Sequence, residues 1–330
     1  MQVKAELNHA NLLKTPPHRA HSLAAFVAAM VLVYPAFAEE GGAGHYTPGA
    51  MATLIDLPPT KPGWVIEPVY LHYQGNVEVS RPLPVAGLLA ANLEATSDAA
   101  LLGGFHTFKE PIAGAWYSLG LFVPYVWMDA TATVTTPLGA VQRHDTEAGI
   151  GDVTLLPVML GWKHKDWLFD AVLPIYAPTG QYETGRLANP GRNYWTFDPT
   201  LGVAYNGAKS GLNAAVHTGF SINTENEATD YQSGVAWHVE ASVQQLLPIG
   251  PGFLGIGAEG FCYEQITGDS GSGATLGDLE GRTLGVGPVL SYVLPMKDNT
   301  LVFEARWLPE LETKNRLEGD YFWVKLAYQF

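Results

Sequence analysis

The chain has 330 residues, of which 47% are hydrophobic, 11% aromatic and only 15% charged, against about 25% charged in an ordinary soluble domain. Acidic residues outnumber basic residues by 32 to 18, a formal net charge of −14, which excludes a nucleic-acid partner because phosphate binding needs a surplus of Lys and Arg. The single cysteine, Cys262, excludes a disulfide framework and a paired-cysteine metal site. Low charge with many aromatic residues favours one class of membrane protein, the β-barrel.

The first 38 residues have the pattern of a secretory signal peptide. Three basic residues precede an apolar stretch from Leu23 to Val33, and Ala36-Phe37-Ala38 follows as an Ala-x-Ala cleavage site. The apolar stretch is shorter than the roughly 20 residues that a spanning helix needs. We therefore expect residues 1–38 to be a signal peptide that is cleaved after Ala38.

Residues 39–63 form a separate N-terminal segment, which lies between the signal peptide and the first strand pattern. Two positions fit this segment. It lies either in the periplasm or inside the barrel as a plug.

From residue 64 to residue 330, apolar residues recur at every second position in twelve blocks separated by turn signals. The blocks span 64–75, 99–108, 114–130, 149–162, 167–178, 195–205, 211–223, 234–247, 252–266, 281–295, 299–311 and 320–330. This pattern predicts an all-β chain that forms one antiparallel, up-and-down transmembrane β-barrel of about twelve strands.

The connections between these blocks alternate in length. The long ones are 76–98, 131–148, 179–194, 224–233, 267–280 and 312–319, and the short ones are 109–113, 163–166, 206–210, 248–251 and 296–298. Tight turns on the periplasmic side and long loops outside are typical of outer-membrane barrels. The expected location is therefore the outer membrane of a Gram-negative bacterium, with lipid around the barrel.

The last block, 320–330, ends in a terminal phenylalanine. Phe322, Val324, Leu326, Tyr328 and Phe330 share one face of the predicted strand. This arrangement resembles the C-terminal signature that barrel-insertion machinery recognises in bacterial outer-membrane proteins, so that machinery is an expected partner.

The side chains at alternate strand positions that are expected to face inward predict whether the lumen is polar or apolar. Strands three to five contribute a mainly apolar and aromatic wall, and strands six to twelve contribute a polar wall of mixed charge. The inward residues expected to line a solute path are Trp116, Phe122, Asp152, Leu156, Trp162, Asp170, Tyr176, Asp198, His217, His238, Glu240, Glu259, Glu304, Arg306 and Lys325. A twelve-stranded barrel has a backbone diameter of roughly 24 Å, so side chains leave a narrow path.

Several motifs also resemble a known family. They are His45-Tyr46 with Pro48-Gly49, Gly149-Ile150-Gly151-Asp152, Pro178–Tyr182, Asn189–Pro199, Asn223–Asn226, Gln265–Gly273 and Asn315-Arg316. Together they are similar to the meta-pathway phenol-degradation family of outer-membrane transporters. The resemblance implies a barrel and a link to aromatic compounds, and it supplies no catalytic residues.

These observations predict a channel or transporter for small hydrophobic or phenol-like compounds. Aromatic side chains of the apolar wall would stack on rings, and carboxylates, His and Arg would orient a hydroxyl group. An alternative is structural, with the apolar wall packed against residues 39–63. A structural or ligand-binding barrel with acidic outer loops also fits, and an outer-membrane hydrolase is the third class.

Three patterns invite enzymatic interpretations that their context does not support. Gly268–Gly273 is similar to a serine-protease nucleophile loop, but that chemistry needs a neighbouring His and Asp. Gly255–Gly260 satisfies GxGxxG inside a strand pattern, where no helix follows. The histidines show no metal spacing, and Asp269 with Asp278 is at most a cation-accepting turn. We expect no enzymatic activity, no cofactor and no metal.

Overall fold

The computed structural model describes residues 39–77, 82–277 and 280–330, so the predicted signal peptide, residues 1–38, lies outside the described residues. The described chain is nearly all-β, with one short 3-10 helix, η1 (Glu40–Gly42). In these ranges no helix is both long enough and apolar enough to cross a membrane.

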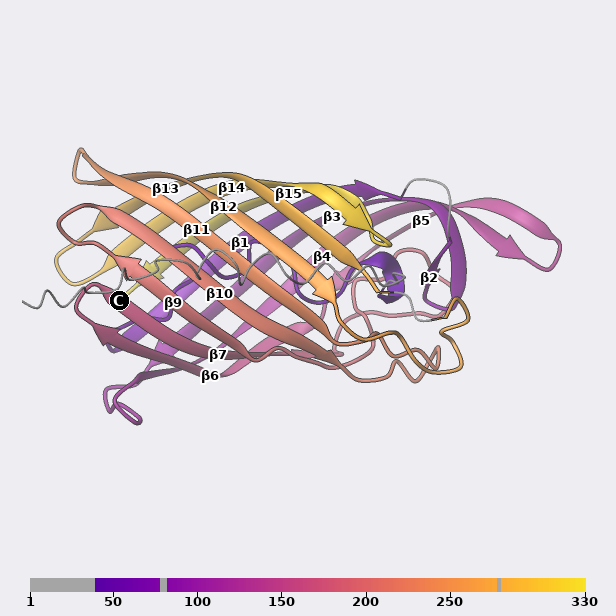
Figure 1. Ribbon diagram of the computed structural model, residues 1–330, viewed down its shortest axis with the longest axis horizontal. Helices are drawn as coiled ribbons and strands as arrows, with labels where there is room; N and C mark the ends of the chain where they lie inside the picture. Colours follow the sequence, from indigo (N-terminus) through magenta and orange to yellow (C-terminus); the bar gives the residue numbers. More distant parts are fainter. Residues whose placement is uncertain (1–38, 78–81, 278–279) are drawn as a thin grey trace, which may run out of the picture. The chain divides into compact units, whose positions relative to one another are not determined.

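One antiparallel sheet contains every strand (Figure 1). The strands are β1 (Gly63–Asn76), β2 (Leu83–Val85), β3 (Leu88–Thr107), β4 (Trp116–Thr136), β5 (Gly139–Ile150), β6 (Val153–His164), β7 (Trp167–Ala177), β8 (Thr196–Phe197), β9 (Thr200–Asn206), β10 (Leu212–Asn223), β11 (Ala236–Ile249), β12 (Gly252–Gln265), β13 (Arg282–Pro295), β14 (Thr300–Lys314) and β15 (Glu318–Gln329).

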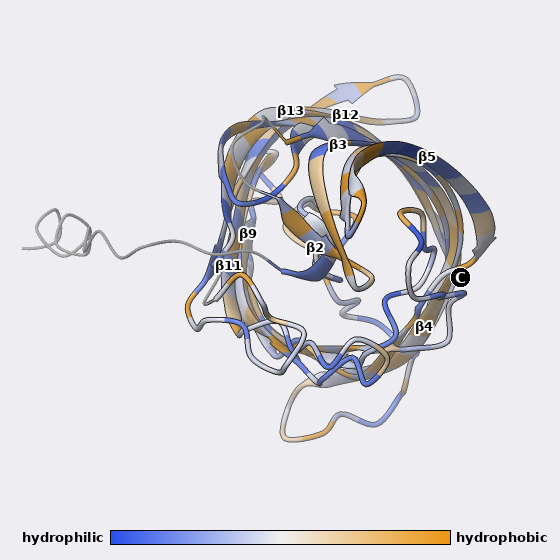
Figure 2. Cartoon of the chain, turned by 90° about the vertical axis from the view of Figure 1, so that its right-hand side faces the viewer, coloured by the Kyte–Doolittle hydropathy of each residue, from blue (hydrophilic) through white to orange (hydrophobic). Residues whose placement is uncertain are grey.

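The sheet closes on itself as a twelve-stranded barrel. β5 and β6 both pair with β4 and share one position in the wall, and β8 and β9 share the position between β7 and β10. Pairing of β3 with β4 and of β1 with β15 completes the circle, which is seen along its axis in Figure 2. The predicted twelve-stranded, up-and-down barrel is confirmed.

The strands alternate between an apolar outer face and a lumenal face. In β15, Phe322 and Leu326 are exposed on the outside, whereas Trp323 and Lys325 are buried inside. Closure leaves no free edge around the barrel, and this matters because lipid cannot satisfy unpaired backbone groups. Trp64 and Phe330 exchange both backbone hydrogen bonds where the first and last strands meet.

The two ends of the barrel differ in their connections. At one end, here called the short-turn end, the connections are 108–115, 165–166, 207–211, 250–251 and 296–299. The opposite end, the long-loop end, carries 178–195, 224–235 and the connection between β12 and β13 (Figure 1). Two connections predicted to be long are not. Residues 139–148 belong to β5, and β14 joins β15 through residues 315–317 alone.

The missed strand segments share a physical cause. β3 begins eleven residues earlier than predicted, and β4 and β5 form a hairpin that extends past the neighbouring strands at the long-loop end (Figure 1). Outward positions in this region are polar, among them Glu94, Asp129 and His144. Asp129 and His144 even bond to each other, at 3.0 Å. Because this part of the wall lacks an apolar outer face, it lacks the alternation that marks a lipid-facing strand.

A β-bulge in β6 reverses the faces of half that strand. At Pro157, which has no N–H for the ladder, the register with β7 slips by one residue. Beyond the bulge, Gly161 lies opposite the buried Asp170, and Trp162 lies opposite Phe169, which is 48% exposed. The predicted inward orientation of Trp162 is therefore wrong, and its indole ring faces outward.

The bulge predicts opposite environments for two adjacent residues. In a Cys262→Ser background, Leu160→Cys should react with a lipid-soluble maleimide, and Met159→Cys should not, because Met159 is buried on the lumenal face. Mass spectrometry of the labelled barrel in vesicles measures both reactions. Preferential labelling at position 159 would contradict the reversed register.

Candidate functional site

Residues 39–62 lie inside the barrel and are here called the lumenal segment (Figure 1). Near the short-turn end, Pro58 packs over Gly161 of β6. At the long-loop end, the buried carboxylate of Glu39 forms an ion pair with Arg316, between β14 and β15. These contacts hold the described residues of the segment against the inner face of the wall.

The polar wall supplies hydrogen bonds to the backbone of the lumenal segment. Glu240 of β11 is fully buried and accepts from the hydroxyl of Tyr46 at 2.6 Å and from the backbone N–H groups of Gly49 and Met51 at 3.0 Å each. The indole of Trp323 donates to the carbonyl of Pro48 at 2.9 Å. Irregular backbone that is buried inside a protein needs such partners, because its N–H and C=O groups have no partners in a helix or sheet.

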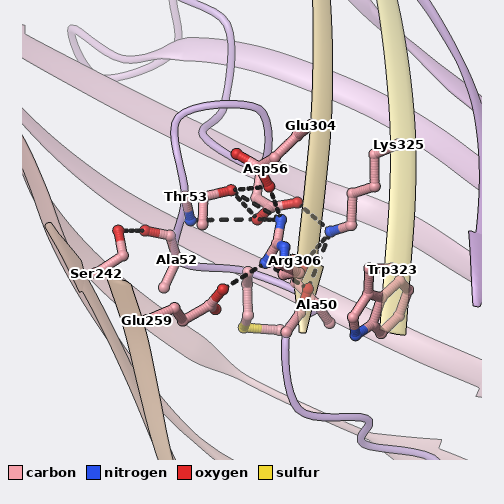
Figure 3. Close-up of polar contacts among 12 residues, drawn as sticks. Ala50, Ala52, Thr53, Asp56, Ser242, Glu259, Glu304, Arg306, Trp323 and Lys325 are labelled. Atoms are coloured by element: carbon pink, nitrogen blue, oxygen red, sulfur yellow. Dashed lines mark hydrogen bonds and ion pairs between the residues drawn. The ribbon is translucent and has the colours of Figure 1, made fainter. Parts of the chain in front are cut away.

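A buried ion cluster fixes the middle of the segment (Figure 3). Arg306 of β14 donates to Asp56 at 2.9 Å, to Glu259 of β12 at 2.8 Å and to the neighbouring Glu304. Lys325 of β15 also forms an ion pair with Asp56. Asp56 thus joins the lumenal segment to two cations that are buried in the wall.

The lumenal histidines are paired with carboxylates. His217 lies 3.1 Å from Asp170, and His238 lies 2.8 Å from Asp198. The ring of Tyr46 stacks on His238, with 4.0 Å between the ring centroids. No group of three His, Cys, Asp or Glu side chains placed to hold a metal ion occurs in the described ranges.

A cavity of about 400 Å³ lies between the lumenal segment and the apolar wall. Of the lining residues that lie on strands, most come from β1, β3, β4, β6 and β7, with apolar side chains such as Val69, Leu71, Phe105, Phe122, Leu156, Met159 and Val172. The exposed lining surface is mainly apolar, although many polar side chains also border the cavity. Several of them gather toward the long-loop end, where His45, Asp152, Tyr176, Arg192 and Tyr194 line the cavity. The empty space therefore adjoins the apolar half of the lumen, opposite the polar half that holds the segment.

Residues 80–326 match the family described as "Putative MetA-pathway of phenol degradation". The chain belongs to this family. No functionally curated protein shows significant similarity to this family member.

Two solved outer-membrane barrels align with the chain, and the first has the same fold. An outer membrane channel from Pseudomonas putida F1 aligns with a TM-score of 0.60 and 15% identity, over 86% of this chain and 100% of that one. The beta domain of the Bordetella autotransporter BrkA aligns over 82% of this chain and 100% of that one, with a TM-score of 0.45 and 11% identity. This phenol-degradation family member thus has the fold of an outer-membrane barrel.

The structure divides the predicted lumenal residues into three groups. Those that line the cavity are Phe122, Asp152, Leu156, Tyr176, His217 and Lys325. Those held against the lumenal segment or one another are Asp170, Asp198, His238, Glu240, Glu259, Glu304 and Arg306. Trp116 lies opposite Gly161 on the inward face at the short-turn end, away from the cavity, and Trp162 faces outward.

Sequence analysis missed several residues that line the cavity, notably His45, Glu67 and Arg192. Parity along β1 places Glu67 inward, because Trp64 and Ile66 face outward. His45 and Arg192 both lie in motifs that resemble the family, where the sequence offered no role for them.

Asp269 is held by hydrogen bonds within the described residues. Its carboxylate accepts hydrogen bonds from the hydroxyl of Tyr231, from the backbone N–H of Gly234 at 2.9 Å and from Gln265 at 2.6 Å. Asp278, the second expected ligand, lies outside the described residues. Burial raises the pKa of Asp269 to about 7.

The raised pKa of Asp269 predicts that the loop of residues 266–277 opens more readily as the pH rises. Between about pH 4 and pH 7 the folded loop keeps a proton that an opened loop has lost, so closure weakens across this window. Hydrogen exchange of residues 266–277, corrected for the intrinsic rate, should therefore be faster at pH 8 than at pH 5. Asp269→Asn should abolish this difference, and an unchanged difference in that variant would contradict the assignment.

The ion cluster predicts that Asp56→Asn loosens the lumenal segment. Removing one partner of a buried ion pair costs about 3–5 kcal/mol, because the remaining charge is left uncompensated. Hydrogen exchange of residues 45–56 should therefore accelerate, and single-channel conductance should increase. Glu225→Gln, which removes an exposed carboxylate, is the matched control. Unchanged exchange in Asp56→Asn would show that the cluster does not hold the segment.

Proposed function

We propose that this barrel conducts small hydrophobic or phenol-like compounds across the outer membrane of a Gram-negative bacterium. The observation that carries the proposal is the cavity of about 400 Å³ along the apolar wall. Sites for small ligands typically enclose roughly 300–1,000 Å³, with mostly apolar walls and a few placed polar groups. The cavity has this size, and its exposed lining surface is mainly apolar.

The asymmetry of the lumen supports a solute of this kind. A water-filled pore for polar solutes gains nothing from a wall of Val69, Phe122 and Leu156, because apolar surface in contact with water is unfavourable. The same wall favours an aromatic ring, which loses its own contact with water there. The description of the family, phenol degradation, agrees with an aromatic solute.

In this proposal the lumenal segment acts as a plug. It occupies the polar half of the lumen and forms one side of the cavity, through His45 and Ile55 among others. A solute that crosses the barrel must pass this segment, so its displacement or local rearrangement would gate the path. The signal peptide would direct export, and residues 320–330 would engage the insertion machinery.

Filling the cavity should block transport without removing the plug. Ala99 lines the cavity, so Ala99→Phe places a ring in the path, whereas Ala241→Phe adds the same ring to the outer face. In vesicles with a lipopolysaccharide outer leaflet, Ala99→Phe should lower protein-dependent uptake of phenol and toluene by about tenfold. Ala241→Phe should leave uptake unchanged.

The transport function itself is tested by comparing vesicles with and without the protein. Equal uptake of both solutes in the two preparations would refute it. Resistance to heat unfolding in detergent, measured by gel mobility, verifies that each variant forms the barrel.

A further inference from the structure

A rigid polar frame borders the cavity at the long-loop end. The carboxylate of Asp152 accepts from the backbone N–H groups of Gly180 at 2.9 Å and Arg192 at 2.6 Å. The ring of His45 lies 2.9 Å from the same carboxylate through Nε2 and 2.7 Å from the hydroxyl of Thr196 through Nδ1. Wall, loop 178–195 and lumenal segment are therefore joined at one point.

Two buried polar atoms in this region lack a partner in the described chain. The hydroxyl of Tyr194, a residue 3% exposed, makes no hydrogen bond. Glu40 accepts from Asn226 at 2.9 Å through Oε2, and Thr229 and the backbone of Gly87 lie near the carboxylate, while its buried Oε1 makes no hydrogen bond of ordinary geometry to the described residues. Both residues line the cavity. An unmade hydrogen bond is costly when the group is buried, so a ligand that completes these bonds is favoured.

Arg192 adds a cation to the same region. Its backbone N–H is bonded to Asp152, and its guanidinium lies close enough to Glu40 to interact electrostatically with that carboxylate. Gly41, next to Glu40, has a φ of +81°, and a Cβ built there would lie 3.4 Å from Nη1 of Arg192. The guanidinium is thus against the backbone beside Glu40. Tyr194 in turn packs edge-on against His45, with 5.0 Å between ring centroids.

These groups offer both kinds of hydrogen bond. A guanidinium and a tyrosine hydroxyl donate, and a carboxylate oxygen accepts. A phenolic hydroxyl needs one acceptor and at least one donor, whereas a carboxylate needs donors alone and a methyl group needs neither. The set therefore matches a neutral hydroxyl group, because the opposite charges of Glu40 and Arg192 leave no net attraction for an anionic solute.

We propose that Glu40, Arg192 and Tyr194 form a binding subsite for the hydroxyl group of a neutral phenol-like solute. Arg192 and Tyr194 donate to the hydroxyl oxygen, and Oε1 of Glu40 accepts its proton in a hydrogen bond. The inference deepens the proposed transport function and rests on it.

The neighbouring aromatic residues hold the ring of such a solute. His45 stacks on Tyr176 with an interplanar angle of 12° and 5.0 Å between centroids, which fixes a flat surface at the edge of the subsite. Apolar residues of the cavity, including Leu156 and Val172, continue from it. A hydroxylated ring can therefore place its oxygen in the subsite and its hydrocarbon edge against the apolar wall.

Binding to the purified barrel in detergent tests the subsite with phenol, toluene and benzoate as probes. Phenol should bind most tightly. Arg192→Gln and Tyr194→Phe should each weaken phenol binding by about fivefold and leave toluene binding unchanged. Arg282→Gln and Tyr205→Phe remove the same groups away from the cavity and should change neither. Equal affinity for phenol and toluene, or equal losses for both in Arg192→Gln, would overturn the proposal.

Glu40→Gln gives a test by gain of binding. The Gln oxygen can keep the bond from Asn226, and its amide replaces the acceptor Oε1 with a donor. Phenol binding should weaken while benzoate binding strengthens, and a loss for both would overturn the proposal. Uptake by vesicles distinguishes a failure of the subsite proposal from a failure of the transport proposal. Discrimination in detergent without any uptake refutes transport alone, and uptake that is insensitive to Arg192→Gln for all three solutes refutes the subsite alone.

Discussion

Hydrogen bonding of the lumenal segment is the constraint on which the rest of the lumen depends. Residues 39–62 cross the barrel with only one short 3-10 helix, so most of their backbone groups have no partner within the segment. Inside the lumen these groups need partners from the wall. Glu240, Arg306, Trp323 and Lys325 are buried where they supply such bonds, which explains a wall of mixed charge within a membrane barrel.

The same constraint divides the lumen into two halves. β11, β12, β14 and β15 carry charges that are paired with the segment or with one another, because a buried charge without a partner is unstable. β1, β3, β4, β6 and β7 carry mainly apolar side chains there and leave the cavity. One wall thus holds the segment, and the other is left to contact a solute.

Alternation in the sequence predicted the barrel because contact with lipid imposes it on every spanning strand. In β15 it assigned Phe322 and Lys325 to the correct faces. The alternation failed to predict strands or their faces where lipid contact does not impose it. The hairpin of β4 and β5 has polar outward residues such as Asp129, and the bulge at Pro157 shifts the parity before Trp162. A proline inside a predicted strand was the available signal for that shift.

The candidate site was less predictable than the barrel, because its contacts join residues far apart in the chain. Asp56 and Arg306 are 250 residues apart, and the lumenal segment has no periodicity that indicates which side chains meet the wall. Parity showed that Glu240 and Arg306 face inward, but not that the segment binds them. Only the folded chain shows that the cavity is bordered by His45 and Arg192.

The lumenal segment has contacts on two sides, and in the proposed transport function this would link solute binding to opening. Asp56 binds the polar wall, while Glu40, His45 and Ile55 line the cavity. A solute in the cavity therefore touches the segment that obstructs it. Binding shifts the segment only if the solute has a different affinity for the displaced arrangement. Asp56 belongs to the same continuous stretch as Glu40, His45 and Ile55. Contacts of that stretch at the long-loop end can therefore alter how firmly the ion cluster holds the lumenal segment.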